Sequence, residues 1–590
     1  SGRADIDLVK FQGNDAANAL GPFQGNWAHR LSIAKGSAAQ IDNAPALVFE
    51  YHMEKPNQRG GLWYALGHFD ARGYDAVEFE VRGSHGGEML SFGLKDDRWF
   101  EDMEPVAKYL PKGITTEWQK VRIPLADFTR VRQWYSLDNW TLSASNGGEG
   151  EKSGKVFVRH LRFAGEGKKQ PPPNEPKEVY PLEFDPAKAS DAQIWEALQK
   201  SAFLFFWNEA DAKRGLVKDA CYAYGPDGMQ SCSIASVGFG LSAICVAEKR
   251  GWITHDQAYE RVLNTLRFFA NEADQVHGFY YHFYDMDTGE RSGDCEVSSI
   301  DSGLLFYGVI SAKQFYPNTE AATLADNILD RVEWDWMQLP GGDVLSMGCK
   351  PGEPLFDASW RHYNEGVMLY PLAIGSRTHP IDPKVWNRVE REVFKLQGRD
   401  FVPGSGDNAL FTHQYPQCWL DLRRMKDKKG INYFRNSIEA TKANREWCLA
   451  NAAHFKSFAG GYWGLTAADA PKGYAVNGAP GGKCDGTVAP TAALASVVFT
   501  PDLATEAARK FFTIKDKIWG RYGFVDAFNL AEDWYSTRYI GIDQGPIVLM
   551  AQNQRDEMIW KLTMQEPSVK AGLQKMGFEP DSGGPGLLKK

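Results

Sequence analysis

The sequence predicts two domains, a β-sandwich at the N-terminus and a toroid of paired α-helices after it. The chain has 590 residues, more than one ordinary hydrophobic core supports. Its apolar residues recur with a period of two before about residue 165 and with a helical period after it. A polar, proline-rich segment separates the two patterns. We therefore place the sandwich at 1–164, a linker at 165–180 and the helical domain at 181–590.

The N-terminal region consists of short alternating runs such as APALVFEYHM and YDAVEFEVRG, separated by Gly, Asp and Asn turns. This pattern is typical of a β-sandwich. Its aromatic residues could stack on sugars, but we expect most of them to be structural: these are Trp99, Trp118, Trp134, Tyr135 and Trp140.

The segment GEGKKQPPPNEPKEV follows, with three successive prolines at positions 171 to 173. Such a composition predicts a semi-rigid linker of the polyproline type.

The region after the linker is helical in pattern. DAQIWEALQKSAFLFFWNEA opens behind Ser190 and Asp191, which are suitable N-cap residues, and about a dozen helices fit between residues 190 and 575. Several connecting loops are long, and long loops in a compact helical domain are usually functional. Regular helix pairing with long loops on one side predicts an (α/α) toroid whose inner helices begin at a central cleft.

Composition excludes several classes of protein. The formal net charge is −9 and there is no run of five basic residues, so neither nucleic acid nor an anionic membrane is the expected partner. The longest weakly polar run, 233–247, is too short to span a bilayer. We expect a soluble protein whose export signal, if any, is absent from the start SGRADIDLVKF.

The eight cysteines lie between Cys221 and Cys484, without a C-x-x-C pair or zinc-finger spacing, so we expect no metal cluster. Cys221 and Cys232 flank a turn, and either a disulfide between them or two buried thiols fits the sequence.

The stretch from Phe411 to Pro546 carries the richest chemistry. It contains FTHQYPQCWLDLR, GYWGLTAADAPKGY, CDGTVAPTAALAS, WGRYGFVDAFN and YIGIDQGP, in which aromatic residues or glycines accompany carboxylates and amides. A packed core does not need this mixture. A cleft that binds a sugar polymer does, because sugar faces stack on aromatic rings and hydroxyl groups need fixed polar partners.

The blocks SSIDSGLLFYGV, YNEGVMLYPLAIGSRTHP and GIDQGPIVLMAQNQR resemble the bacterial glucoamylase-like family, and the similarity covers nearly all of 180–580. That family includes inverting (α/α)6 hydrolases of β-1,2-glucan, either endo-acting or sophorose-releasing. The N-terminal region more weakly resembles galactose-binding-like jelly rolls. The resemblance implies a periplasmic or extracellular β-glucan hydrolase, with β-1,2-glucan as the expected substrate and without metal or organic cofactor.

Glycoside hydrolysis needs a carboxylic acid to protonate the leaving oxygen and a carboxylate to activate water. Glu365 lies in RHYNEGVMLY among apolar and aromatic neighbours, so burial should raise its pKa as a general acid requires. The alternative is a carboxylate placed only by the helix dipole. Gly366 stands where we expect a bulkier residue.

Asp543 in GIDQGPIVLM is the base candidate. It precedes Pro546, so it could instead be a helix N-cap, and hydrogen bonds from backbone N–H groups would then keep it ionised. Asp301 and Asp485 occupy similar helix-entry positions and could replace it as base or bind substrate hydroxyls.

Aromatic and polar residues of the same loops are the candidate walls of the sugar-binding subsites, with helix packing as the alternative for each aromatic. They are His413, Gln414, Tyr415, Trp419, Arg423, Trp463, Asp469, Tyr474, Trp519 and Trp534.

Three other functions fit a helical toroid. A polysaccharide lyase needs a basic cleft, and the helical domain has no such concentration of Lys and Arg. A non-catalytic glycan-binding protein would keep the aromatic residues and lose the acids. A third alternative is a hydrolase of a non-glucose polysaccharide. The sequence also does not decide between endo and exo action, and it does not give the oligomeric state.

Overall fold

A computed structural model describes residues 6–12, 15–18, 24–29, 33–54, 58–146, 152–167 and 177–582. The chain divides into two compact units. Unit 1 contains Ser1–Glu175 and Pro226–Met229, and unit 2 contains Pro176–Gly225 and Gln230–Lys590. The three prolines of the predicted linker lie outside the described residues.

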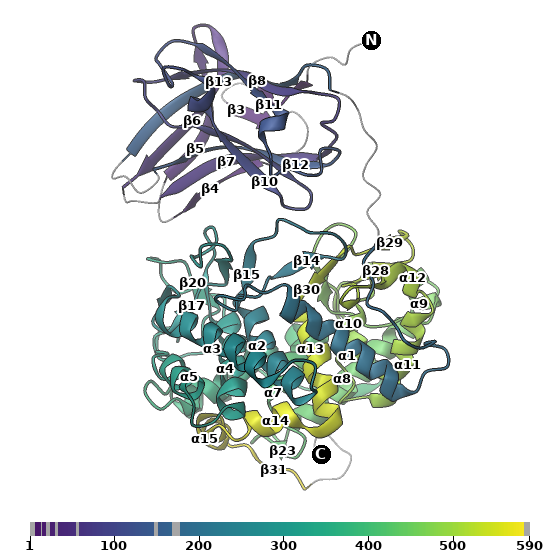
Figure 1. Cartoon of the computed structure of the whole chain (residues 1–590). Helices are drawn as coiled ribbons and strands as arrows, with labels where there is room; N and C mark the ends of the chain where they lie inside the picture. The colour runs from purple at the N-terminus through teal and green to yellow at the C-terminus, as the bar shows by residue number, and fades with distance from the viewer. Residues whose placement is uncertain are drawn as a thin grey trace. The chain divides into compact units, whose positions relative to one another are not determined.

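Unit 1 is the predicted β-sandwich (Figure 1). Its two antiparallel sheets have the strand orders β11-β8-β13-β6-β5 and β10-β9-β12-β7-β4, and β1 also pairs with β13. The strands are β1 (Ile6–Asp7), β2 (Val9–Gln12), β3 (Asp15–Asn18), β4 (Gln24–His29), β5 (Ile33–Ile41), β6 (Ala44–Met53), β7 (Arg59–Phe69), β8 (Ala76–Gly83), β9 (Ser91–Asp96), β10 (Glu101–Pro105), β11 (Gln119–Pro124), β12 (Leu137–Ser145) and β13 (Lys152–Ala164), with the short 3-10 helices η1 (Val106–Tyr109) and η2 (Leu125–Asp127).

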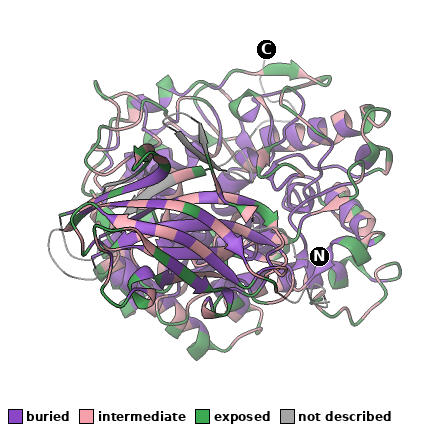
Figure 2. Cartoon of the chain, turned by 90° about the horizontal axis from the view of Figure 1, so that it is seen from above, coloured by how far each residue is buried: buried purple, intermediate pink, exposed green. Residues whose placement is uncertain are grey.

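The period of two sorts the side chains of unit 1 between core and surface, and the strands in Figure 2 accordingly alternate between buried and less buried residues. In β8, Val77 and Phe79 point into the core. Trp140 is fully buried and stacks on Tyr64 with 4.3 Å between ring centroids. It is therefore a core residue, as expected, whereas Trp99 is 47% exposed.

Unit 2 is an (α/α)6 toroid, as predicted. Six of its described helices are buried over most of their residues and form the inner ring: α2 (Ile234–Lys249), α4 (Ser299–Phe315), α6 (Leu369–Gly375), α7 (Phe411–Trp419), α10 (Pro490–Leu494) and α13 (Gly541–Asp556). The outer ring consists of α1 (Asp191–Asn208), α3 (His255–Asn271), α5 (Glu320–Asp330), α8 (Tyr433–Ala450), α11 (Pro501–Phe512) and α15 (Pro567–Lys575). The sequences explain which helices lie in the inner ring and which in the outer ring, because α2 is apolar on all sides and α3 is amphipathic.

The loops of unit 2 contain short elements. They are β14 (Ala220–Tyr222), β15 (Ser231–Ser233), β16 (Gln275–Val276), β17 (Phe279–Tyr280), β18 (Phe283–Asp285), β19 (Val297–Ser298), β20 (Gly348–Cys349), η3 (Glu365–Met368), η4 (Pro383–Arg388), β21 (Phe394–Leu396), β22 (Arg399–Phe401), η5 (Gly404–Gly406), β23 (Met425–Lys426), α9 (Lys456–Ala459), β24 (Ala467–Ala468), β25 (Ala475–Val476), α12 (Lys515–Ile518), β26 (Trp519–Gly520), β27 (Gly523–Phe524), β28 (Phe528–Asn529), β29 (Trp534–Tyr535), β30 (Arg538–Ile540), α14 (Met558–Thr563) and β31 (Glu579–Pro580). Strands β15, β19 and β30 each lead directly into an inner helix, so these loops lie where inner helices begin.

Two glycines let inner helices α2 and α4 touch through their backbones. A Cβ atom on Gly308 would lie 2.2 Å from the carbonyl oxygen of Gly238. No larger residue fits this crossing, so it fixes the position of the start of α2 relative to the start of α4.

Two predictions about helix caps and cysteines can be compared with the structure. The Ser190 hydroxyl accepts from Gln193 N–H at 3.3 Å, which confirms Ser190 as the N-cap of α1. Cys221 and Cys232 are both buried and no disulfide joins them. None of the helices in the described part of the chain combines the length and hydropathy that a bilayer span requires.

Candidate active site

Seven carboxyl groups from separate loops and helix starts gather at one place in unit 2. Backbone hydrogen bonds join the segments that carry them, since Gly541 N–H donates to Asp219 C=O at 2.8 Å and Asp526 N–H donates to Arg538 C=O at 3.1 Å. The charges of several of these groups shift the pKa values of others. The seven residues are Asp219, Asp301, Glu365, Asp407, Asp469, Asp526 and Asp543.

Glu365 opens η3 and has the properties of a general acid. Burial, together with the charges of Asp301 and Asp407, raises its pKa to about 7. The Asn364 side chain caps the turn by accepting from Gly366 N–H at 2.9 Å. Gly366 is required here because a Cβ atom would lie 2.3 Å from the Trp360 ring. The space expected for a bulkier residue at position 366 is thus filled by Trp360.

Asp543 lies in the first turn of α13 but does not cap it. The N-cap is Ile540, without a side-chain hydrogen bond, so the capping alternative is wrong. Burial and the neighbouring Asp526 raise the pKa of Asp543 well above its usual range. The prediction that hydrogen bonds keep Asp543 ionised is therefore also wrong.

Asp526, between β27 and β28, is a site residue that the sequence did not identify. Burial and the charge of Asp469 raise its pKa to about 7, and the neighbouring Asp543 carboxyl group also acts on it. In the sequence it is one acid among apolar residues in GFVDAFN, which reads as a turn between packed strands.

Asp469 supports the cluster from behind. Its Oδ2 accepts from the Ser536 hydroxyl at 2.8 Å and from Arg538 Nε at 3.1 Å, while its own N–H donates to Asp526 Oδ2 at 2.6 Å. Only 5% of Asp469 is exposed, and its hydrogen bonds hold the side chains of Ser536 and Arg538 in place.

His282 is the second residue that the sequence did not identify. Its Nδ1 lies 2.8 Å from Glu296 and its Nε2 lies 3.5 Å from Asp301. Burial alone would lower its pKa, but the charges of Asp301, Glu296 and Asp219 outweigh burial and raise it to about 9. The hydrogen bond from His282 in turn lowers the pKa of Glu296 to about 2. A cationic ring therefore holds Asp301, whose Oδ2 also accepts from the Ser298 hydroxyl at 2.5 Å.

Two predicted tyrosines lie at the cluster. Tyr415 of α7 is buried, and burial and the Asp543 charge, with a smaller effect from Glu365, raise its pKa. Tyr474 precedes β25, and burial and the charges of Asp543 and Asp526 raise its pKa. Its side chain is nevertheless 51% exposed, so its ring offers a surface to a ligand beside the carboxyl groups.

Other predicted subsite residues are buried in the helical core. His413 is fully buried with Nε2 3.0 Å from Asn408 Oδ1, and burial lowers its pKa to about 3. Gln414 donates to Ala492 C=O at 2.8 Å, and Trp419 donates to the Ser242 hydroxyl at 2.9 Å. These polar groups join neighbouring inner helices.

Trp463 and Trp519 are also buried, since each is only 3% exposed. Trp519 donates to Tyr180 C=O at 2.9 Å. Trp534 is half-buried against a small cluster of alanines that includes Ala468 and Ala527, and it keeps some exposed surface.

Arg423 and Asp485 lie outside the cluster. Arg423 pairs with Asp421 at 2.8 Å and with Glu557 at 2.7 Å. Glu557 follows the end of α13 while Asp543 is near its start, so Arg423 lies about 20 Å from Asp543 along the helix axis. Asp485 is exposed and closes a turn by accepting from Thr487 N–H at 2.9 Å.

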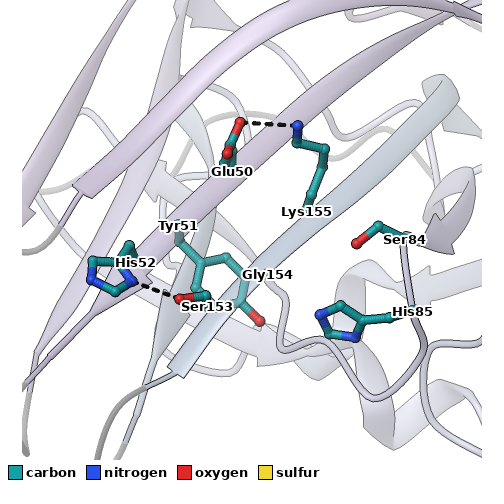
Figure 3. A pocket seen from close by; sticks show the side chains of 8 residues that line it. All are labelled: Glu50, Tyr51, His52, Ser84, His85, Ser153, Gly154 and Lys155. Atoms are coloured by element: carbon teal, nitrogen blue, oxygen red, sulfur yellow. Dashed lines mark hydrogen bonds and ion pairs between the residues drawn. The ribbon is translucent and has the colours of Figure 1, made fainter.

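A hollow of about 460 Å³ lies on unit 1 and contains none of these seven carboxyl groups (Figure 3). It contains the Glu50–Lys155 ion pair at 3.3 Å and the contact between His52 and Ser153 at 2.6 Å. The ring of Tyr51 is buried and offers no stacking face, so cavity size alone does not locate the active site here.

Unit 2 is thus an (α/α)6 toroid in which a cluster of carboxyl groups lies where inner helices begin. Residues 357–567 match the family model described as "Putative glucoamylase", and residues 34–165 match that of carbohydrate binding domain 30. The structure of a "putative glucoamylase" from Bacteroides uniformis is similar to this chain, with 31% identity, a TM-score of 0.62 and coverage of 67% of this chain and 98% of that chain. The chain belongs to this glucoamylase-like family.

Two relatives carry more specific names. The endo-β-1,2-glucanase of Chitinophaga pinensis, solved with sophorotriose and glucose, is 30% identical with a TM-score of 0.61, over 66% of this chain and 99% of that one. An exo β-1,2-glucooligosaccharide sophorohydrolase of Parabacteroides distasonis is 29% identical over 429 residues, 66% of this chain. The match spans 58% of that relative's length.

Proposed function

We propose that this protein hydrolyses β-glucan, with β-1,2-glucan as its substrate, by a single displacement that inverts the anomeric centre. The observation that carries the proposal is Glu365, a partly buried carboxyl group whose pKa is raised to about 7, in the same cluster as the buried carboxyl groups of Asp526 and Asp543. The names of two relatives, a β-1,2-glucanase and a sophorohydrolase, supply the substrate class.

In this mechanism Glu365 donates its proton to the glycosidic oxygen as the bond to the anomeric carbon breaks. Asp543 receives a proton from the water that attacks the opposite face of the sugar. Inverting enzymes keep the two groups roughly 6.5–9.5 Å apart, which leaves room for that water. Of the other base candidates, Asp301 instead stabilises the protonated form of Glu365 by its charge, and Asp485 has no part in the reaction.

Tyr474, Tyr415 and Trp534 are the predicted subsite residues that we retain. Tyr474 has the exposed ring that stacking on a sugar requires, and stacking buries a large area with little loss of side-chain entropy.

Residues 181–590 form the hydrolytic domain in this proposal, and residues 1–164 form an accessory module that holds glycan near it. We place the protein in the periplasm or outside the cell, where polymeric glucan is encountered. The match to carbohydrate binding domain 30 supports the role of the module.

The test is a product assay on linear β-1,2-, β-1,3-, β-1,4- and α-linked glucans, resolved by chain length, with Glu365→Gln as the matched control. We expect cleavage of β-1,2-glucan alone and products that first appear as α-anomers by NMR. Sophorose as the first product would assign exo action, and a ladder of oligomers endo action. No cleavage of any glucan, or β-anomers as first products, would overturn the proposal.

A further inference from the structure

Asp526 and Asp543 form a buried pair of carboxyl groups from different parts of the toroid. Each residue is 2% exposed. Asp526 comes from the connection between β27 and β28, and Asp543 comes from the first turn of α13. The two side chains lie close enough for each to shift the pKa of the other, as a hydrogen-bonding contact between them would.

This contact requires a proton. An ionised carboxylate only accepts hydrogen bonds, so two of them cannot bond to each other, whereas one proton turns the pair into a donor and an acceptor. Asp526 Oδ1 and Asp543 Oδ2 are both buried, and neither oxygen has a hydrogen-bond partner among the residues that the structure describes. One proton between the two groups supplies what both oxygens lack.

The surroundings determine which group holds the charge. Asp526 Oδ2 accepts from Asp469 N–H at 2.6 Å, a bond that favours the ionised form of Asp526. The charge of Asp469 is balanced by Arg538, with Nε at 3.1 Å from Oδ2. The resting pair is therefore a protonated Asp543 that donates to an ionised Asp526.

We propose that Asp526 and Asp543 act as one base with a single shared proton, in which Asp526 is the positioning residue that lets Asp543 accept a proton from water. This inference rests on the proposed function. As the water oxygen bonds to the anomeric carbon, its proton passes to Asp543 and the shared proton passes to Asp526. The pair then carries two protons and Glu365 carries the negative charge, so the total charge of the site is unchanged. The resting state returns when the pair releases one proton and Glu365 takes one up.

A single substitution distinguishes this pair from two independent acids. In Asp526→Asn the amide N–H₂ still donates to Asp543, but no second negative charge opposes its ionisation. Asp543 is then ionised at lower pH. We expect the acidic limb of the kcat/KM profile to move down by at least one pH unit and kcat to fall less than about 100-fold, whereas Asp543→Asn loses more than about 1,000-fold.

The experiment measures kcat/KM on β-1,2-glucan between pH 4 and 9 for wild type, Asp526→Asn and Asp543→Asn, with Asp485→Asn as the exposed control. An acidic limb that stays in place in Asp526→Asn, or a loss as large as that of Asp543→Asn without any shift, overturns the shared-proton base.

A second measurement does not depend on activity. Infrared spectroscopy of the wild-type protein at pH 7, with aspartate labelled by ¹³C at the side-chain carboxyl, should show the C=O stretch of a protonated carboxyl group. The band should disappear in Asp526→Asn and persist in Asp485→Asn. A wild-type protein without this band overturns the pair, whereas a wild-type protein that has the band but cleaves no glucan overturns only the proposed function.

Discussion

The guanidinium of Arg538 forms an ion pair with Asp469 directly behind the Asp526–Asp543 pair, with Arg538 Nε 3.1 Å from Asp469 Oδ2. Asp469 is buried, whereas Arg538 is partly exposed. The position of this cation explains how so many carboxyl groups lie together in a folded protein, since an isolated buried charge is costly and a paired one is tolerated.

Arg538→Gln should therefore lower both stability and the ionisation of the carboxyl groups. We expect the free energy of unfolding to fall by about 2–4 kcal/mol, because Asp469 loses its partner. The acidic limb of kcat/KM should move to higher pH, since removal of a positive charge strengthens proton binding by Asp526 and Asp543. Urea unfolding and a pH profile check the two effects. Arg538→Lys keeps the charge and should leave the limb near its wild-type position; an equal shift in both variants would contradict the electrostatic explanation.

Glu365→Gln should reduce kcat by about 10²–10⁴-fold while the protein stays folded. The acid must carry its proton, so kcat/KM of the wild type should fall as pH rises through about 7. An aryl glycoside with a good leaving group needs little proton donation and should restore much of the lost rate. The alkaline limb and the aryl substrate are both measured by steady-state kinetics, with a melting curve as the control for folding. A wild-type rate that stays constant between pH 6 and 9 would exclude Glu365 as the acid.

His282→Gln should destabilise the protein in a pH-dependent way. The pKa of His282 is about 9 in the folded state and the ordinary value is 6.5, so its contribution is complete below pH 6.5 and disappears as pH rises through 9. Glu296 contributes above pH 4.5 and loses its contribution as pH falls towards 2. The variant should thus lose on the order of 1–2 kcal/mol between pH 4.5 and 6.5 and little above pH 9.

Unfolding in urea at pH 5.5 and pH 9.5 measures this difference. The matched control is His362→Gln, because His362 and Glu390 form an ion pair at 3.0 Å with side chains 62% and 57% exposed, and exposed pairs contribute little. Equal losses for His282→Gln at both pH values would show that packing, not charge, is responsible.

Tyr474→Ala should weaken substrate binding more than it slows the chemical step. The exposed ring is expected to contribute about 1–1.5 kcal/mol by stacking, so KM should rise roughly 5–10-fold with a smaller change in kcat. Tyr474→Phe keeps the ring and should stay close to wild type. Phe394→Ala, at a 49% exposed position in β21, is the control for loss of a surface aromatic. Unchanged KM in Tyr474→Ala would remove Tyr474 from the subsites.

The fold could be predicted because its periodicities are local. The alternation in β8 and the all-apolar sequence of α2 are visible along the chain, and they determine which element is a strand and which is an inner helix. The raised pKa of Glu365 was predictable for the same reason, since apolar and aromatic residues are adjacent to it in the sequence.

The rest of the site depends on contacts between distant segments. His282 binds Glu296 and Asp301 from another loop, and Asp526 meets Asp543 only after β27 and α13 are assembled. The burial of His413, Gln414 and Trp419 could not be predicted from the sequence for a related reason. An inner helix is buried on all sides, so its pattern cannot distinguish a side chain that faces the cleft from one that bonds to the next helix.

The contact between Gly238 and Gly308 limits how such a protein can diverge. A side chain at either position would collide with the backbone of the partner helix, so neither glycine can change unless the helices separate along their whole length. New substrate preferences are therefore expected to arise by insertion and deletion in the connecting loops, where changes of length cost little free energy. The helical ring is expected to stay constant from one descendant to the next.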